Sequence, residues 1–174
     1  MKRRSIQKPG GQQATRSSRS VGVLFTVAVL FAGLFCTIGS AASLSVGEDG
    51  YATISGALEE AMPGDTLFIG SGTYYESLSI SIPVTITGVD TGGGLPVIVA
   101  TEGEAAIVVE AGRTTLEGLV ITGTVPCGIF VHADNTVITG TTISTTFSGT
   151  SMGICIYDAD RTLVTENIIG GQRI

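Results

Sequence analysis

The sequence predicts an all-β fold: a parallel β-helix (solenoid) of about four to five coils with a short N-terminal capping helix. The first observation is an internal repeat, because residues 105–121, 127–143 and 152–168 can be written one under another. Aliphatic residues recur in them at shared offsets of 22 and 25, in the columns Ile107, Ile129, Ile154, then Leu116, Ile138, Leu163, then Ile121, Ile143, Ile168. Three columns with the same offsets indicate one repeated supersecondary unit.

The second observation is the spacing of apolar residues inside each repeat. Pairs such as Ile107 and Val109, or Ile154 and Ile156, alternate with other residues, which is typical of strands with one buried face. No repeat shows helical periodicity, so a unit of about 22 residues fits one coil of two or three strands. Like side chains of successive coils then stack roughly 4.8 Å apart. We place the three extra residues of the third repeat in loop 144–152.

Residues 1–42 are expected to be a targeting segment. Six cations in the first 20 residues precede an apolar run from Val21 to Ile38, and small residues follow at Ser40 and Ala42. This pattern is typical of a secretion signal cut after Ala42, and the run is also just long enough to remain as a membrane anchor. Either way, residues 43–174 form one β-helix domain that is secreted or displayed at the cell surface.

The exported part is strongly acidic. It holds 15 acidic residues, no lysine and three arginines, Arg113, Arg161 and Arg173, so its net charge is near −12. Such a surface repels phosphate backbones and polyanionic glycans, and we expect no nucleic-acid partner. A solvated acidic coat that keeps a β-rich protein soluble accounts for the charge.

Two cysteines, Cys127 and Cys155, lie in the repeats. Strict alternation puts Cys127 on the inward side with Ile129 and turns Cys155 outward. Because the two side chains would then lie on opposite faces of neighbouring strands, we expect no disulfide between them.

The segment before the repeats predicts a capped first coil. Ile54, Ala57, Leu58 and Ala61 share one face of a short helix, which Pro63 and Gly64 stop. Strands are expected at Leu67 to Ile69 and Pro96 to Val99, with a pair of strands within Ser79 to Gly88, a turn over residues 70–76 and a corner at Pro83. An amphipathic helix ahead of the first coil would cover the end of the core.

The pattern T-I-x-x-A-L-x-x-A-x-P-G-D-T-L-x-I-x-x-G-T-Y-x-E, from Thr53 to Glu76, resembles the opening of pectin-lyase-like parallel β-helix proteins. The nearest resemblance is to repeat-bearing surface proteins with carbohydrate-binding and sugar-hydrolase domain repeats. It implies a right-handed helix. The active members of this superfamily use grooves of aspartates with arginine or lysine. No motif here matches such a groove, so we expect no catalytic residue.

Two groups of side chains are candidates for binding. Asn135, Asp158 and Asp160 could hold calcium through oxygen atoms, although turn-forming roles explain them as well, and no other cofactor is expected. If Ile107, Ile129 and Ile154 point inward, then Phe130 points outward, and Glu110, His132 and Tyr157 form the next outward column. Aromatic planes with polar groups between them suit the faces and hydroxyls of neutral sugars, and ordinary ladder packing is the plainer interpretation.

The sequence thus predicts a non-catalytic, exported β-helix module that binds carbohydrate or a surface protein, with membrane contact only through residues 21–38. One alternative is a fragment of a polysaccharide-active lyase, hydrolase or esterase, and another is a structural spacer. The repeats run to Ile168 and Gly-Gly-Gln-Arg-Ile follows without a cap, so we expect a C-terminally incomplete domain or end-to-end self-association.

Overall fold

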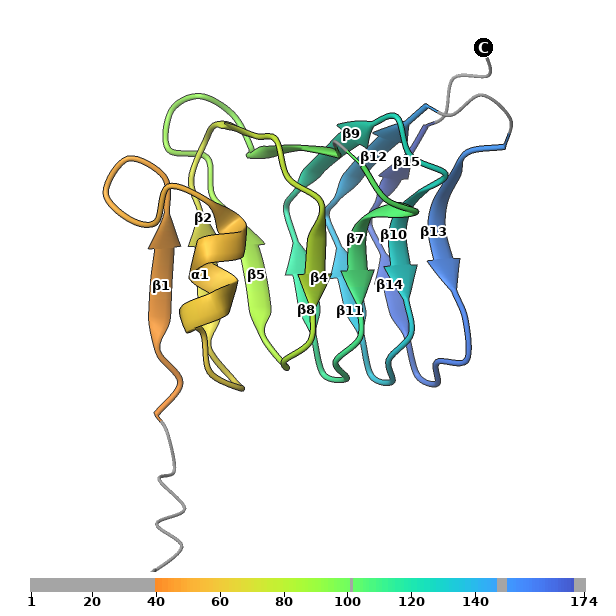
Figure 1. Cartoon of the computed structure of the whole chain (residues 1–174), viewed down its shortest axis with the longest axis horizontal. Coiled ribbons are helices and arrows are strands. Elements are labelled where there is room, and N and C mark those ends of the chain that lie inside the picture. The colour runs from red at the N-terminus through yellow and green to blue at the C-terminus, as the bar shows by residue number, and fades with distance from the viewer. Residues whose placement is uncertain (1–39, 101, 147–149, 171–174) are drawn as a thin grey trace, which may run out of the picture. The chain divides into compact units, whose positions relative to one another are not determined.

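The computed structural model describes residues 40–100, 102–146 and 150–170. In this part the chain winds into a right-handed parallel β-helix of about five turns with one short helix (Figure 1). The predicted fold class is confirmed. The helix is α1 (Ile54–Glu60), and the strands are β1 (Ser43–Val46), β2 (Thr66–Ile69), β3 (Thr73–Tyr74), β4 (Leu78–Ile80), β5 (Thr85–Gly88), β6 (Val97–Ala100), β7 (Ala105–Val109), β8 (Thr115–Glu117), β9 (Val120–Gly123), β10 (Cys127–Val131), β11 (Val137–Thr139), β12 (Thr142–Thr145), β13 (Met152–Ile156), β14 (Leu163–Thr165) and β15 (Ile168–Ile169).

The strands form three parallel sheets that run the length of the β-helix. The six-stranded sheet has the order β1-β2-β5-β8-β11-β14, the five-stranded sheet β15-β12-β9-β6-β3, and the four-stranded sheet β13-β10-β7-β4. Each full coil contributes one short strand to each sheet, and backbone hydrogen bonds join it to the coils before and after. This arrangement satisfies the backbone polar groups that a core of β-branched residues would otherwise bury unpaired.

The core is a set of aliphatic ladders, as the repeat predicted. Ile129 pairs in register with Ile107 on one side and with Ile154 on the other. Ile107 and Ile129 are fully buried, and Ile154 packs against the core from the last coil. Full burial of one such side chain contributes about 1.5–3 kcal/mol, so the stacked columns are the main source of stability.

The last coil has no coil packed on its outer side in the described part of the chain. Ile156 is 48% exposed, whereas its register partner Val131 is fully buried. Val164 is 39% exposed and Ile169 54%, although their register partners Ile138 and Ile143 are fully buried. The apolar side chains that would point into the core therefore meet solvent at this end.

The register of the last coil corrects two of the predicted columns. Ile138 pairs with Val164 rather than Leu163, and Ile143 pairs with Ile169 rather than Ile168. The offset is thus 25 residues in the four-stranded sheet but 26 in the other two. The added residue lies in the turn after Ile156, where Asp158 takes a left-handed conformation with φ 52°.

The preceding turns show why this slip occurs. Each has one left-handed residue, Arg113 (φ 64°) or Asn135 (φ 57°), whereas the last turn has two, Asp158 and Arg161 (φ 56°). Because side chains alternate with period two, a slip of one residue exchanges inward and outward positions. Val164 and Ile169 consequently take the places predicted for their neighbours.

Helix α1 packs against β1, β2 and β4, next to the first coil (Figure 1). Its apolar residues Ile54 and Ala57 are fully buried, so the predicted amphipathic helix is confirmed. Thr53 is the N-cap, and its hydroxyl oxygen accepts a hydrogen bond from the Gly56 amide at 3.1 Å. The side chain of Glu76 binds the same helix end from the turn before β4.

Within the described residues, no helix is long and apolar enough to cross a membrane. The predicted signal or anchor, whose apolar run spans Val21 to Ile38, lies outside the described residues.

Candidate functional site

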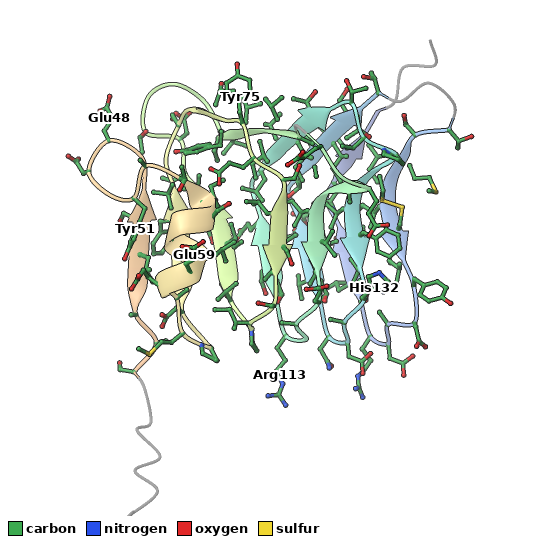
Figure 2. The ribbon with its side chains drawn as sticks, viewed as in Figure 1. Glu48, Tyr51, Glu59, Tyr75, Arg113 and His132 are labelled. Carbon is green, nitrogen blue, oxygen red and sulfur yellow. A yellow bond between two sulfur atoms is a disulfide. The ribbon has the colours of Figure 1, made fainter. Side chains whose placement is uncertain are left out.

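Three side chains form an aromatic patch on the outer face of the four-stranded sheet: Phe130, His132 and Tyr157. The rings of Phe130 and His132 are stacked, with centroids 4.3 Å apart and planes 27° apart. The edge of one ring meets the face of the other between His132 and Tyr157, with centroids 5.9 Å apart and an interplanar angle of 69°. Figure 2 shows the His132 side chain turned outward from β10.

Strand geometry explains why these rings meet. Phe130 and His132 are two residues apart and therefore lie on the same side of the chain. Val131 pairs with Ile156, so Tyr157 follows directly beside His132 in the next coil. The Tyr157 amide donates to the Val131 carbonyl at 2.9 Å, which holds its backbone in the ladder. Tyr157 is 66% exposed, and the patch is open to solvent.

Glu110 occupies the predicted column one coil before His132. Val109 and Val131 are register partners, which places the residues that follow them beside each other. The Glu110 carboxylate accepts a hydrogen bond at 3.1 Å from the Ser79 hydroxyl of the preceding coil. Glu110 therefore lies on the same face as the patch. Its carboxylate, however, is hydrogen-bonded to the preceding coil, on the side of β7 away from β10.

The structure contradicts the expectation that Cys127 and Cys155 stay apart, because they form a disulfide. Cys155 is the register partner of Phe130, three residues along the strand from Cys127. In a straight strand three residues span about 10 Å. The two Cα atoms are only 6.5 Å apart, within the range that a disulfide bridges.

The start of β10, where Cys127 lies, does not follow the period-two pattern. Cys127, Gly128 and Ile129 are all buried, so alternation is interrupted there. A Cβ on Gly128 would lie 2.6 Å from the carbonyl oxygen of Gly153, which only glycine allows. The prediction of no disulfide was wrong because it assumed strict alternation along β10. Gly128 and Gly153 were the features of the sequence that could have indicated the interruption.

The calcium candidates lie in the turns between β10 and β11 and between β13 and β14. The backbone N–H of Asn135 donates to the backbone carbonyl of Asp160 at 2.9 Å. The backbone N–H of Asp160 donates to the Asp134 carboxylate at 2.7 Å. Asp134 also lies 3.8 Å from the Arg161 guanidinium. In the described part of the chain, no group of three or more His, Cys, Asp or Glu side chains is placed to hold a metal ion. Asn135 and Asp160 make hydrogen bonds that are typical of turn residues. Asp158 has a left-handed backbone conformation in the turn that is one residue longer than the turns before it.

A groove that the sequence did not suggest lies at the ends of β1, β2 and β5. Its volume is about 950 Å³, and Phe68, Val89, Ser71, Thr91 and the loop 47–50 are among its lining. Ser71 and Thr91 exchange backbone-to-hydroxyl hydrogen bonds across it. The amides of Gly92 and Gly94 donate to Asp90, which lowers the pKa of that carboxyl. In the sequence, only the glycines at 70, 72 and 92–94 could have indicated this groove.

No family model and no curated protein sequence matches this chain. Two solved structures of the pectin methylesterase from Aspergillus niger, in deglycosylated and penultimately deglycosylated form, are similar to it, each with a TM-score of 0.57 and 18% identity. Each match covers 75% of this chain and 57% of that chain. This chain thus spans little more than half the length of the enzyme it matches, and the likeness shows a common fold.

Proposed function

We propose that this β-helix is an exported, non-catalytic module that binds neutral carbohydrate on the aromatic patch. The observation that carries the proposal is the stack of Phe130 on His132, with Tyr157 beside it, on an outer sheet face. Surface aromatic rings bury apolar area at small conformational cost, and their polar atoms can bind hydroxyl groups. The aliphatic C–H face of a sugar ring would lie on these planes, with the nitrogen atoms of His132 at its edge.

Charge supports a neutral ligand. The described part of the chain contains two arginines, and both lie in turns: Arg113 and Arg161, the second beside Asp134. Neither belongs to the sheet face that carries the patch. A polyanionic glycan would meet an acidic surface there without a cation to receive it.

The proposed lack of catalysis rests on the same arrangement. Removing a proton beside a carboxylate needs a base, together with a cation that stabilises the negative charge that develops. In the described residues, the Arg161 guanidinium lies 3.8 Å from the Asp134 carboxylate, and the Arg161 side chain is 71% exposed. Such an exposed pair offers little of the preorganised electrostatics that catalysis requires.

Titration with neutral oligosaccharides of different linkage, followed by calorimetry, tests the proposal. The Phe130→Ala, Tyr157→Ala double variant should bind about 5- to 100-fold more weakly, since each aromatic contact is worth about 0.5–1.5 kcal/mol. Tyr75→Ala is the matched control, because Tyr75 is similarly exposed at 71% and lies elsewhere on the β-helix (Figure 2). Binding that is unchanged in the double variant would remove the patch as the site, and capture of a surface protein instead would identify the other partner class.

A second candidate function, a polysaccharide-active enzyme, is favoured by the fold shared with pectin methylesterase. A pectin methylesterase assay with the purified chain separates the two. Activity above a heat-denatured control would support the enzyme, and oligosaccharide binding without turnover supports the module. A structural spacer would show neither activity nor binding.

A further inference from the structure

The disulfide and the aromatic patch share the same two strands. Cys127 begins β10, which also carries Phe130, and Cys155 lies in β13, two residues before Tyr157. Cys155 is moreover the register partner of Phe130. The bond therefore joins the half of the patch on β10 to the half that follows β13.

Packing secures these two strands very unequally. On β10, Ile129 and Val131 are fully buried between neighbouring coils. On β13, Ile154 is only partly buried and Ile156 is 48% exposed. Since buried apolar area is the main force that holds a strand, the covalent link matters more for β13, which otherwise relies on its backbone pairing with β10.

The turn after β13 adds little to its anchoring. It contains two left-handed residues, Asp158 and Arg161, and such conformations are costly for residues other than glycine. Its ion pair, between Arg161 and Asp134, is long and exposed. Tyr157 lies between this turn and β13, so its position beside His132 depends on both.

The two sulfur atoms differ in their access to solvent. Cys127 is 1% exposed, whereas Cys155 is partly exposed. A thiolate reductant would therefore attack the Sγ of Cys155, forming a mixed disulfide and releasing the Cys127 thiolate, which takes up a proton. A second thiol then displaces Cys155, so that two reductant thiols are oxidised to one disulfide and the protein gains two thiols.

We propose that the Cys127–Cys155 disulfide is a redox-controlled clasp that assembles the aromatic patch. With the bond intact, Tyr157 lies against His132. After reduction by a small dithiol, β13 separates from β10, Tyr157 leaves the patch, and the rest of the solenoid stays folded. The control of binding rests on the function proposed above, whereas the assembly of the patch does not.

His132 allows a test without any ligand, because it is the only histidine in the chain. Its ring stacks on Phe130 at 4.3 Å, so its proton resonances in tag-free protein report the patch directly. On addition of dithiothreitol, we expect the ring-current shift on His132 to change and hydrogen exchange over residues 152–157 to accelerate tenfold or more. Exchange over residues 105–109, on the far side of β10, should stay unchanged.

One variant completes the test. Cys155→Ala should reproduce the reduced state without reductant. Dithiothreitol added to this variant is the matched control and should change neither signal further, because the bond is already absent. Reoxidation of the wild-type protein should restore both signals. If the His132 proton resonances and the hydrogen exchange of residues 152–157 are the same in oxidised, reduced and Cys155→Ala protein, the proposal that the disulfide assembles the patch is wrong.

Oligosaccharide titration distinguishes failure of this inference from failure of the proposed function. Equal affinity in oxidised and reduced protein, with the patch intact in both, rejects redox control and leaves the binding function standing. A patch that disassembles on reduction in a protein that binds no oligosaccharide in either state supports the clasp and rejects carbohydrate binding.

Discussion

The carboxylate of Glu76 binds the N-terminus of helix α1, where it accepts hydrogen bonds from the Ile54 and Ser55 amides, each at 2.9 Å. It also accepts one from the Ser55 hydroxyl at 2.6 Å. These amides have no partner within the helix, and the helix dipole favours negative charge there. Glu76, 22 residues along the chain from Ile54, thereby fastens the helix to the first coil.

Replacing Glu76 with alanine should destabilise the protein by about 1–2 kcal/mol, the usual cost of losing a charged helix cap. Urea unfolding of the full chain measures this. Glu117→Ala, at an exposed carboxylate on β8, is the control and should shift stability by less than about 0.5 kcal/mol. Equal effects of the two changes would show that Glu76 does not cap the helix.

Replacing Glu166 with glycine should stabilise the protein. Glu166 has φ 57° at the turn where the two preceding coils have Gly118 (φ 66°) and Gly140 (φ 58°). A left-handed conformation costs a residue with a Cβ about 1 kcal/mol, and glycine avoids this cost. Thermal unfolding should show a higher midpoint for Glu166→Gly and a lower one for Glu117→Gly, where glycine weakens a strand. A decrease in both variants would contradict the assigned turn.

Shortening two isoleucines of one ladder should have unequal effects. Ile107→Ala should cost about 2–5 kcal/mol, because Ile107 is fully buried and leaves a cavity. Ile154→Ala should cost less than half as much, because Ile154 is only partly buried in the last coil. Chemical denaturation of both variants measures the difference. An Ile154 effect as large as that of Ile107 would mean that another coil or molecule covers this end in solution.

Asp65 should make stability depend on pH at the acidic end. Its carboxylate accepts hydrogen bonds from the Met62 amide at 2.8 Å and the Ala42 amide at 2.7 Å, and these lower its pKa although burial opposes them. A folded pKa below the unfolded one gives stability that is present above the usual value near 3.8 and lost as pH falls through the folded pKa.

The stability difference between the wild type and Asp65→Asn should therefore be largest near neutral pH and shrink below about pH 4. Unfolding curves recorded from pH 7 to pH 2.5 measure it. Ser43→Ala, a nearby substitution on β1 without a titrating group, should show a constant difference over the same range. A difference between wild type and Asp65→Asn that grows on acidification would reverse the assigned sign.

Short-range patterns predicted most of this β-helix. The alternation of Ile107 with Val109 and of Ile129 with Val131 identified the buried faces, because the strand period is a local property. The spacing of Ile54, Ala57, Leu58 and Ala61 located the short helix ahead of the first coil, whereas the backbone contacts of Asp65 and Glu76 were not predicted. The position of Phe130 and His132 on one outer face followed from parity, because these residues are two apart, whereas the stacking of their rings was not predicted.

The remaining features depend on distances between coils. Whether Val164 or Leu163 pairs with Ile138 is decided by the conformation of Asp158, one residue in a turn. Cys127 reaches Cys155 at the start of β10, where the burial of Cys127, Gly128 and Ile129 interrupts the period-two pattern. By itself, the sequence determined which residues repeat and which face the strands before the last coil bury, since both follow from backbone geometry over a few residues. Only the tertiary structure decided the register of the last coil and the disulfide between β10 and β13, because both depend on how successive coils lie on one another.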